Sequence, residues 1–536
     1  MKSIRRKFKL VLGMALLTGL LISSMALAQA PVTEDWVARY DTEKVFWISK
    51  LTVDSYGNVY VVGSDQGGTE YVTIKYGPDG NQLWVASYVP TGNCVHPILF
   101  IVLDSQGNVY IASTTNCYPE SGMDFVIIKY DSGGNERWVH TYDGPGVPPY
   151  SLDAPQALAV DSQGNVYVSG WTGYGAAATT IKYDPDGNEL WVAQHWGAAG
   201  YAMALDSQGN AYVTGYDTSN GISYDYLTIK YNTDGQEVWS RRYNGPDSHE
   251  WAFAIAVDSN GNVYVAGNTV WTHPNPPVLM IVKYDNNGNE LWASRYEGVG
   301  IWWSLPPHPL AVDSQGNVYI TGLYTIKDGI PLDTPTMKYD SSGKLLWVAE
   351  SGWTLALDSH GNAYVTTPYG KTIKYDSTGN KVWEIPYDGV ILDIAVDAKE
   401  NVYVVGLNSG NIVTVKYIQP YVQVQIDIKP GSYPNCFNQN ERGVIPVAIF
   451  GCNALNVANI DIGSLSLQGL SVKVTGKSNK YLTHFEDINK DGYDDLIIQF
   501  QDSDGWVVPG SDYATLKGKL YNGTQIMGQD TICIIP

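Results

Sequence analysis

One phrase recurs eight times along this chain, and its regular return constrains the fold more than any other feature. The clearest copy reads LAVDSQGNVYVSG from Leu158 to Gly170 and continues as TTIKYDPDGNELWVAQ from Thr179 to Gln194. Copies of its Asp lie between 39 and 57 residues apart, at Asp54, Asp104, Asp161, Asp206, Asp258, Asp313, Asp358 and Asp397. A period of this size, made only of strand-like pieces, is typical of propellers and similar repeat arrays.

Each copy predicts four short strands joined by tight turns. LAVD, NVYVSG, the piece ending in IKY, and LWVA are the four strand-like pieces. The turns DSQGN and DPDGN begin with an Asp that can bond the backbone two residues on, and their Gly supplies a positive φ. We interpret these turns as hairpin chemistry rather than as weak calcium loops. Only the eighth copy departs from the first turn, with Glu400 in place of Gly.

The number of strand-like pieces indicates how the array ends. Eight IKY-type pieces are present, ending at Tyr76, Tyr130, Tyr183, Tyr231, Tyr284, Tyr339, Tyr375 and Tyr417. A Trp-bearing fourth strand follows only seven of them, and DWVARY (Asp35–Tyr40) near the N-terminus matches the missing one. We expect this strand to complete the last blade, because closure removes exposed sheet edges. The expected fold is all-β: an eight-bladed β-propeller closed by an N-terminal strand and followed by a small β-sandwich.

The phrase VDSxGNVYVTG…TIKYDxDGNxLW resembles the bacterial SBBP β-propeller repeat over roughly residues 35 to 418. That repeat is common in secreted and cell-surface proteins, so the resemblance implies a propeller and an exported protein. It implies no activity, because propellers include both enzymes and binding modules.

The first 28 residues predict a secretory signal peptide. Five basic residues, an apolar stretch and Ala26-Leu27-Ala28 form the usual order of such signals. We therefore divide the chain into a signal peptide (1–28), a propeller (29–418) and a C-terminal module (422–536), in a protein that is secreted, periplasmic or on the surface of a bacterium.

The charge balance restricts the possible partners. The formal net charge is −21, and the signal segment contributes only basic residues. Such acidity disfavours nucleic acid and anionic membrane surfaces. No segment after the signal is long and apolar enough to span a bilayer, so we expect no membrane insertion. The expected partner is a carbohydrate or protein ligand.

The C-terminal module begins with VQVQIDIKPGSYPNCFNQNERGVIPVAIFG, which resembles a recurrent module of secreted bacterial proteins. Alternating apolar positions predict an antiparallel β-sandwich, at Val422, Val424, Ile426, Ile428, Val444, Val447 and Ile449.

The segment DINKDGYDD within this module has the spacing of a calcium loop. Oxygen-bearing side chains stand at Asp487, Asn489, Asp491 and Asp495, and Gly492 allows the backbone to turn around an ion. We expect Ca²⁺ to bind there, with the carbonyl of Tyr493 as a further ligand. The alternative is an acidic hairpin without a metal.

Ligand binding is expected where the repeats differ. The loops between the second and third strands share one face with the loops between blades, and they are long and aromatic. The candidate ligand-binding residues on this variable-loop face are Tyr118, Trp171, Tyr174, Tyr216, Trp271, Trp302, Trp303 and Tyr324. Exposed aromatic rings on a rigid scaffold suit sugar faces or protein hot spots. The alternative is that the rings pack on one another beneath the loops.

A catalytic role is the second hypothesis, in the form of a polysaccharide lyase or glycosidase acting at the channel mouth. Polar residues on or near the same face are His96, His249, His273, His308, Asp153, Asp247, Glu250 and Asp333. They form no known catalytic spacing, so we name no catalytic residue and favour a binding or adhesion protein.

Five cysteines can form disulfides in an exported protein. Cys94 and Cys117 are expected to pair, because the predicted topology places both on the variable-loop face. Of the other three, Cys436 with Cys452 is the expected pair, and Cys533 is left over.

Overall fold

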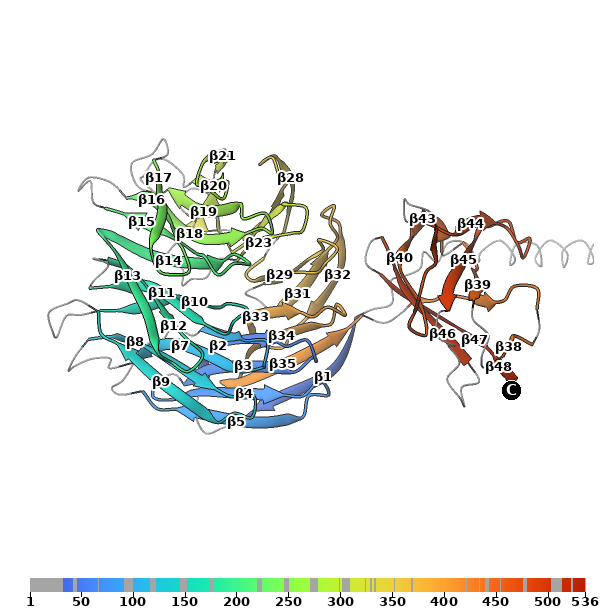
Figure 1. Cartoon of the computed structure of the whole chain (residues 1–536), viewed down its shortest axis with the longest axis horizontal. Helices are drawn as coiled ribbons and strands as arrows, with labels where there is room; N and C mark the ends of the chain where they lie inside the picture. Colours follow the sequence, from blue (N-terminus) through green and yellow to red (C-terminus); the bar gives the residue numbers. More distant parts are fainter. Residues whose placement is uncertain are drawn as a thin grey trace, which may run out of the picture. The chain divides into compact units, whose positions relative to one another are not determined.

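The structure is a computed structural model that describes residues 32–535 with internal gaps. The gaps are 42–45, 66, 91–99, 116–121, 145–151, 174–176, 219–223, 245–249, 270–277, 298, 301–308, 323, 328–329, 332–333, 351, 368–369, 420–421, 433, 439–442, 454, 476–479, 503–512 and 522–523. Residues 34–418 form one compact unit, the repeat unit, and residues 419–536 belong to a second, the C-terminal unit (Figure 1). Strands dominate both, and the described residues contain one short 3-10 helix, η1 (Val457–Asn459).

The described part of the repeat unit contains eight four-stranded sheets, which we number in chain order. Sheet one consists of β2 (Phe46–Val53), β3 (Val59–Asp65), β4 (Tyr71–Tyr76) and β5 (Gln82–Tyr88), and sheet two of β6 (Phe100–Leu103), β7 (Val109–Thr115), β8 (Asp124–Tyr130) and β9 (Glu136–Tyr142). Sheet three consists of β10 (Ala154–Val160), β11 (Val166–Thr172), β12 (Ala177–Tyr183) and β13 (Glu189–Trp196), and sheet four of β14 (Ala198–Leu205), β15 (Ala211–Asp217), β16 (Asp225–Tyr231) and β17 (Glu237–Tyr243). Sheet five consists of β18 (Glu250–Val257), β19 (Val263–Thr269), β20 (Val278–Tyr284) and β21 (Glu290–Glu297). Sheet six consists of β23 (Leu310–Val312), β24 (Val318–Ile320), β27 (Thr336–Tyr339) and β28 (Leu345–Ala349), and sheet seven of β29 (Leu355–Leu357), β30 (Ala363–Thr367), β31 (Lys371–Tyr375) and β32 (Lys381–Pro386).

Sheet eight draws on both ends of the repeat unit. It consists of β33 (Val390–Val396), β34 (Val402–Asn408), β35 (Asn411–Ile418) and β1 (Thr33–Tyr40), with β1 beside β35. The strand DWVARY therefore lies next to the strand that contains Tyr417, as the sequence predicts. A small additional sheet, β22 (Val299–Gly300), β25 (Tyr324–Lys327) and β26 (Ile330–Pro331), lies outside the eightfold pattern.

The burial of the strands follows their position within a sheet. Second and third strands such as β7 and β8 are buried along their whole length, whereas the fourth strand β5 alternates exposed and half-buried residues. Neighbouring sheets share cores: Tyr60 and Val62 of sheet one pack with Ile111 and Val126 of sheet two. The middle strands therefore form the apolar interior, and the outer strand faces solvent on one side.

The first turn of each repeat is built around its Asp, as expected for hairpin chemistry. In sheet one, Asp54 Oδ1 accepts hydrogen bonds from the backbone N–H groups of Tyr56 and Asn58, each at 2.9 Å. Its Oδ2 accepts from Asn58 Nδ2 at 2.7 Å and from the Tyr60 hydroxyl at 3.2 Å. Gly57 has a φ of 83°, which an L-residue rarely adopts. All the hydrogen-bonding capacity of this carboxylate thus serves the turn.

A second set of repeated contacts joins each sheet to the next. In sheet one, the indole Nε1 of Trp84 and the ammonium of Lys75 both donate to the carbonyl of Ser132 in sheet two, at 3.1 and 3.2 Å. Gly134 of the same turn lies on the Trp84 ring, where a Cβ would come within 2.7 Å of the indole. We call this arrangement the Trp–Lys clamp. It explains why Trp, Lys and the second turn glycine recur together.

The clamp is found at seven junctions between sheets. The accepting carbonyls belong to Ser132, Pro185, Thr233, Asn286, Ser341, Ser377 and Pro78. The last of these joins sheet eight to sheet one, where Trp36 of β1 and Lys416 of β35 donate to Pro78 at 3.0 and 3.1 Å. The two ends of the repeat unit are therefore held together by the same contacts as its interior sheets.

The junction between sheets seven and eight differs, because sheet eight lacks the turn that would follow Tyr417. The Trp383 indole nitrogen has no hydrogen-bond partner among the described residues. Lys374 instead lies 3.7 Å from the carboxylate of Glu400, and both side chains are fully buried. Glu400 adopts a φ of 62° at the position that is Gly in the other seven repeats. The departure noticed in the sequence thus supplies a partner for a buried lysine.

The C-terminal unit contains two larger sheets around one core. The first is β36 (Val422–Gln423), β47 (Gln525–Thr531), β46 (Tyr513–Leu520), β40 (Ile460–Leu467) and β41 (Leu470–Ser471). The second is β37 (Ile426–Ile428), β39 (Gly443–Ile449), β45 (Asp495–Asp502) and β44 (Thr483–Glu486). Two short pairs complete it: β38 (Cys436–Asn438) with β48 (Cys533–Ile535), and β42 (Val474–Thr475) with β43 (Lys480–Tyr481).

Apolar residues from both sheets form a single core, as in a β-sandwich. Val447 and Ile498 of one sheet and Leu516 and Ile526 of the other are fully buried in it. Val444 does not take part, because its side chain is 37% exposed. The predicted alternation is therefore wrong at Val444, and the buried residues of β39 that alternate are Ile445, Val447 and Ile449.

The described cysteines pair differently from the expectation. Cys436 forms a disulfide with Cys533, with Cα atoms 4.4 Å apart, and Cys452 is free. The predicted pair Cys436–Cys452 is therefore wrong. The parallel pairing of β38 with β48 places Cys436 directly opposite Cys533, a long-range register that local spacing does not reveal. Cys94 and Cys117 lie outside the described residues.

Candidate functional site

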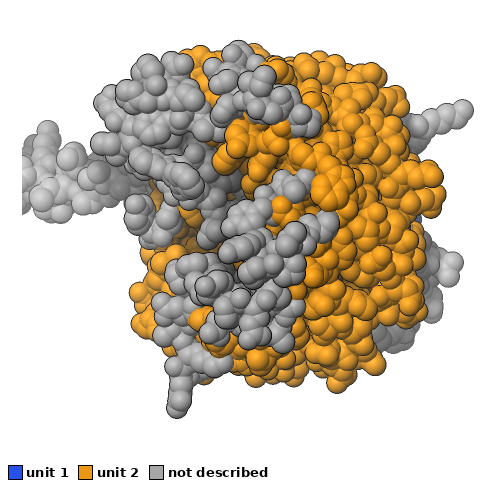
Figure 2. Space-filling view, turned by 90° about the vertical axis from the view of Figure 1, so that its left-hand side faces the viewer, with its two compact units in different colours: residues 1–33, 419–536 blue, residues 34–418 orange. Residues whose placement is uncertain are grey.

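Most of the residues proposed for ligand binding lie outside the described residues, in segments drawn in grey in Figure 2. Tyr118, Tyr174, Trp271, Trp302 and Trp303 lie outside the described residues. Tyr324 lies in β25, and its side chain is not described. Trp171 lies in β11 and is half-buried. Tyr216, in β15, is the predicted residue with the most informative surroundings.

Tyr216 lies at the centre of an aromatic cluster between sheets four and five. Its ring is 5.8 Å from that of Trp251 in a stacked orientation, and 5.7 Å from that of Tyr201. Tyr224 meets it edge-on at 5.0 Å and Trp251 at 5.8 Å. The indole of Trp251 is 40% exposed. Three packed tyrosines thus support one accessible tryptophan.

Local backbone features of sheet four position this aromatic cluster. Ala199 pairs with Tyr216 and Gly200 with Gly215, and the register then shifts between Gly200 and Ala202. The extra residue at this β-bulge is Tyr201, and bulges re-aim side chains in this way. A Cβ at Gly215 would lie 1.8 Å from the Ala199 carbonyl, so the close approach requires glycine. The residues Tyr201, Tyr224 and Trp251 are not among those predicted from the sequence. The segment AGYA at residues 199–202, where the bulge lies, is the sequence signal that was available.

The aromatic cluster is electrically neutral, and a charged group lies beside it. Burial raises the pKa of Tyr201 and of Tyr216, so both hydroxyls stay protonated near neutral pH. Asp217, the residue after Tyr216, is buried and accepts a charged contact from Arg242 at 2.5 Å. His195 of sheet three lies 3.7 Å from the same carboxylate. The aromatic rings therefore form an uncharged stacking surface, and the buried Asp217 is neutralised by Arg242.

Two groups of acidic side chains have converging oxygen atoms. The ligand atoms of Asp124, Asp143 and Asp153 lie within 4.8 Å of one another. Asp153 accepts from the backbone N–H groups of Gly144 at 2.5 Å and Gly173 at 2.8 Å, so this carboxylate organises the loops around it.

The second convergent group is Asp358, His360 and Glu400. His360 Nδ1 lies 3.2 Å from Glu400, whose other oxygen faces Lys374. The lysine ammonium already supplies the positive charge that a metal ion would bring, so this group is an ion-pair network.

The residues considered for catalysis are largely outside the described residues: His96, His249, His273, His308, Asp247 and Asp333. The two that are described, Asp153 and Glu250, are fully buried. Asp153 binds backbone N–H groups, and Glu250 begins β18 with its own N–H donated to the Tyr224 carbonyl at 2.8 Å. Their described contacts hold loops in place.

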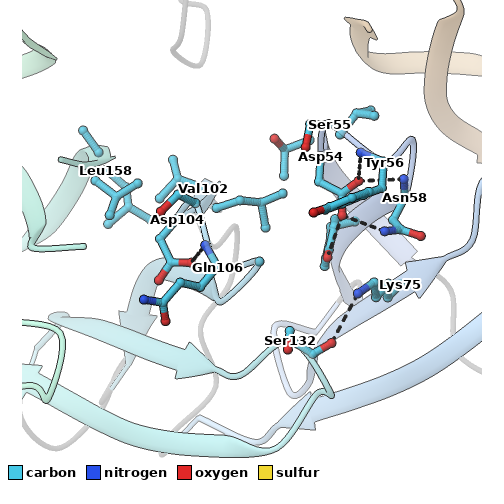
Figure 3. A pocket seen from close by; sticks show the side chains of 18 residues that line it. Asp54, Ser55, Tyr56, Asn58, Lys75, Val102, Asp104, Gln106, Ser132 and Leu158 are labelled. Atoms are coloured by element: carbon cyan, nitrogen blue, oxygen red, sulfur yellow. Dashed lines mark hydrogen bonds between the residues drawn. The ribbon is translucent and has the colours of Figure 1, made fainter. Parts of the chain in front are cut away.

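A cavity of about 870 Å³ lies at the opposite end of the strands, among the first turns (Figure 3). Its walls come from the first strands and turns of sheets one to three, including Val53, Val102 and Leu158. The charged groups on its lining are engaged within the fold: Asp54 serves its turn, and Lys75 donates to Ser132. The cavity therefore has mixed polar and apolar walls, and Asp54 and Lys75 on its lining are already engaged within the fold.

The calcium-type loop of the C-terminal unit has its predicted side chains in one turn. Asp487 accepts from the N–H groups of Asp491 and Gly492 at 3.1 and 3.0 Å, and Asn489 Oδ1 accepts from Asp491 N–H at 3.0 Å. Gly492 has a φ of 92°, as the expected backbone turn requires.

Asp495 differs from the other loop residues because it is buried. Its two oxygens accept from the N–H groups of Gly451 and Ile488, each at 2.9 Å. Among the described residues, the carboxylates of Asp487, Asp491 and Asp495 do not all lie within 4.8 Å of one another. Tyr493 is 43% exposed. Four of the predicted ligands thus surround an open turn, and Asp495 anchors its base.

A family model for the SBBP β-propeller repeat matches residues 238–269, from the fourth strand of sheet four to the second strand of sheet five. This stretch of the chain is therefore similar to one β-propeller repeat. Among curated proteins, the chain is 25% identical over 175 residues to an uncharacterized WD repeat-containing protein of Acanthamoeba polyphaga mimivirus, a match that covers 28% of this chain and 11% of that protein's length.

Two solved structures show partial similarity to this chain. BamB from Moraxella catarrhalis has a TM-score of 0.45 at 15% identity, covering 73% of this chain and 99% of that one. The Dos1 propeller has a TM-score of 0.47 at 10% identity, covering 73% of this chain and 96% of that one. No helix in the described part of the chain has both the length and the apolar character needed to cross a membrane.

Proposed function

We propose that this protein is an exported or cell-surface binding protein that uses the variable-loop face of its propeller as a platform for a carbohydrate or protein ligand. The observation that carries the proposal is the aromatic cluster of Tyr201, Tyr216, Tyr224 and Trp251. The repeated residues are used in turns and clamps, whereas these four do not belong to the repeated phrase. A rigid scaffold lets such a surface bind with little loss of conformational entropy.

The chemistry of the cluster favours a carbohydrate as the first ligand class to test. An exposed indole on packed rings can stack against the apolar face of a sugar.

The test is a glycan and polysaccharide screen read for retention and for product release. We expect Trp251→Ala to lose most retention, and Trp196→Ala, a still more exposed Trp at the end of β13, to keep it. Equal retention by both variants would contradict the carbohydrate site at this cluster. Steady release of shortened or unsaturated products would favour the lyase or glycosidase hypothesis instead.

We also propose that the eight sheets are the blades of one closed ring, with β1 as the closing strand. The support is the clamp of Trp36 and Lys416 on Pro78, which repeats the contacts of six interior junctions. Trp36 also contacts Tyr76 of sheet one and Tyr403 of sheet eight, at 6.2 and 6.4 Å between ring centroids.

Two further proposals concern the chain ends. Residues 1–28 would direct export, which N-terminal sequencing of the secreted protein would test. Ca²⁺ would bind Asp487, Asn489, Asp491, the Tyr493 carbonyl and Asp495. Millimolar calcium should then raise the melting temperature of the C-terminal unit by mass action, and Asp491→Ala should remove the increment. An unchanged melting temperature would leave the acidic hairpin.

A further inference from the structure

The cavity among the first turns is lined by positions at which sheets one and two depart from the other repeats (Figure 3). Two residues before the repeated Asp, sheet one has Thr52 and sheet two has Val102, and both line the cavity. The other six repeats have Ala at this position, at Ala159, Ala204, Ala256, Ala311, Ala356 and Ala395. The larger side chains are thus confined to the two sheets that supply most of the cavity wall.

Tyr56 is a third departure, and it lies on the same lining. Two residues after the repeated Asp, four repeats have Gln, at Gln106, Gln163, Gln208 and Gln315. Tyr56 is 81% exposed, whereas Tyr60 of the same repeat is fully buried in the sheet. The turn itself uses only the backbone N–H of Tyr56, which donates to Asp54 at 2.9 Å. The fold therefore does not require an aromatic ring at this position.

The charged groups of the lining are Asp54, Asp104 and Lys75, and all three are engaged within the fold. Each carboxylate accepts two hydrogen bonds on each oxygen, from its own turn and from a Tyr hydroxyl. A carboxylate has about four acceptor positions, so neither Asp keeps one for a ligand. Lys75 donates to the Ser132 carbonyl and lies 4.8 Å from the centre of the Tyr60 ring. The lining thus offers no free carboxylate to a cation, and its carboxylates outnumber its lysine against an anion.

The uncharged part of the lining combines polar groups with an apolar wall. The exposed hydroxyl and amide groups belong to Ser55, Ser105 and Gln106. The apolar wall includes Val102 and Leu158. A wholly apolar ligand would cover the hydroxyl and amide groups without giving them partners, which is costly. A sugar ring has a polar edge and an apolar face, so it matches both surfaces, and the ring of Tyr56 can stack on the apolar face.

We propose that this cavity is a second binding site, which takes a short neutral saccharide held by Tyr56, the apolar wall and the exposed hydroxyl and amide groups. Its volume of about 870 Å³ lies within the range of roughly 300–1,000 Å³ that is usual for ligand pockets. The Asp-centred turns hold Tyr56 and Gln106 in place, so binding orders few additional groups. The site lies at the opposite end of the strands from the aromatic cluster around Trp251, and the proposal does not rest on that cluster.

The experiment measures binding of three neutral disaccharides, maltose, cellobiose and diacetylchitobiose, to the full chain by saturation-transfer NMR and calorimetry. It uses the Trp251→Ala variant as the background, so that the cavity is read separately from the variable-loop face. We expect at least one of the three to bind. Adding Tyr56→Gln should weaken that binding about tenfold, because the stacking ring is lost. This variant introduces the residue that four other repeats have in the same turn, so the fold is retained.

The wall of the cavity has its own variant and control. Thr52→Ala/Val102→Ala also introduces the residue common to the other repeats, and it should weaken binding by about threefold or more, because it removes apolar contacts. The matched control, Asn260→Gln, makes the same kind of change in the turn of sheet five, which does not line the cavity, and should change nothing.

Three outcomes would overturn the proposal. The first is that none of the three disaccharides binds, and the second is that binding is indifferent to Tyr56→Gln. The third is tighter binding of the charged sugars glucosamine or glucuronate than of the neutral probes, because the lining would then select for charge. A further variant tests position: Gln208→Tyr, added to Tyr56→Gln, places a Tyr in the turn of sheet four, away from the cavity, and should not restore binding.

Discussion

Two kinds of junction between neighbouring sheets show which part of the repeat holds the propeller together. At seven junctions, a Trp indole and a Lys ammonium donate to one turn carbonyl of the next sheet. Between sheets seven and eight that turn is absent, Trp383 has no partner among the described residues, and Lys374 meets Glu400. A neutral carbonyl shared by two donors has been replaced by a buried ion pair.

The junction between sheets seven and eight shows that the buried lysine ammonium, rather than the tryptophan indole N–H, must have a partner. A buried indole N–H without a partner costs about 1–3 kcal/mol, whereas an unpaired buried ammonium costs several kcal/mol. Glu400 accepts a left-handed backbone conformation in order to supply that charge. Such strain costs about 1 kcal/mol and is smaller than the penalty it avoids.

The largest effect should come from removing β1, which supplies one clamp. Deleting residues 29–41 exposes the edge of β35 and removes Trp36 from Tyr76 and Tyr403. We expect a loss of at least about 4 kcal/mol, the scale of deleting a large packed aromatic residue, together with aggregation through the new edge. Urea unfolding measures it. A peptide of residues 32–41 added in trans should restore stability, and full stability without it would refute the closing role of β1.

The buried ion pair can be isolated by a double-mutant cycle. Lys374→Met or Glu400→Gln alone should destabilise by about 3 kcal/mol, because each leaves one buried group without its charged partner. The double variant should recover most of that loss, which gives a large coupling energy. The control is the equivalent lysine at a clamp junction, Lys338, which donates to the neutral Ser377 carbonyl. Lys338→Met should destabilise the protein less than Lys374→Met, because it leaves no buried charge without a partner. Additive single effects at Lys374 and Glu400 would contradict the replacement argument.

Tryptophan substitutions compare the two junctions directly. Trp347→Phe loses a hydrogen bond to the Ser377 carbonyl and should cost about 1 kcal/mol more than Trp383→Phe, which loses none among the described residues. Both replacements remove similar apolar area, and both rings contact a Tyr of their own sheet at about the same distance, 6.0 and 5.9 Å. If both variants lose the same free energy of unfolding in chemical denaturation, packing of the ring, and not the hydrogen bond of the indole N–H, stabilises the junction.

The sequence predicts the parts of this fold that depend on local chemistry. The Asp–Gly turns, the four strands of each repeat and the N-terminal strand beside β35 follow from short patterns and from counting. The clamp was not predicted, because a Lys Nζ reaching the carbonyl of Ser132 joins residues 57 positions apart. The role of Glu400 was also missed, although its departure from Gly was visible.

The candidate site was predicted less completely than the fold. Tyr216 was named, but its neighbours Tyr201 and Trp251 reach it through a β-bulge and through sheet-to-sheet packing. Cys436–Cys533 depends on a parallel strand pair between the two ends of the C-terminal unit. Register and bulges of this kind follow from the tertiary fold, so composition and spacing do not reveal them.

The smallest effect should be a change in stability at low pH. It should be confined to the sheets whose third and fourth strands are joined by a turn, as at Asp131 of sheet two. The side-chain amide of Asn135 donates to Asp131, its backbone N–H adds a further bond, and Arg137 contributes, so the pKa of Asp131 falls from 3.8 to about 2. A carboxyl whose pKa is lowered on folding stabilises the fold above its unfolded pKa, and that stabilisation is lost as the pH falls from about 4 through about 2. The equivalent residue of sheet four is Asn232, whose side-chain oxygen accepts hydrogen bonds from the backbone N–H groups of Asp234 and Gln236. Asp131→Asn should therefore keep the geometry of the turn and remove its charge. The variant should therefore be slightly less stable than the parent at pH 5, and the difference should shrink toward zero by pH 2. A difference that stays constant across this range in urea unfolding would show that the turn draws its stability from geometry alone.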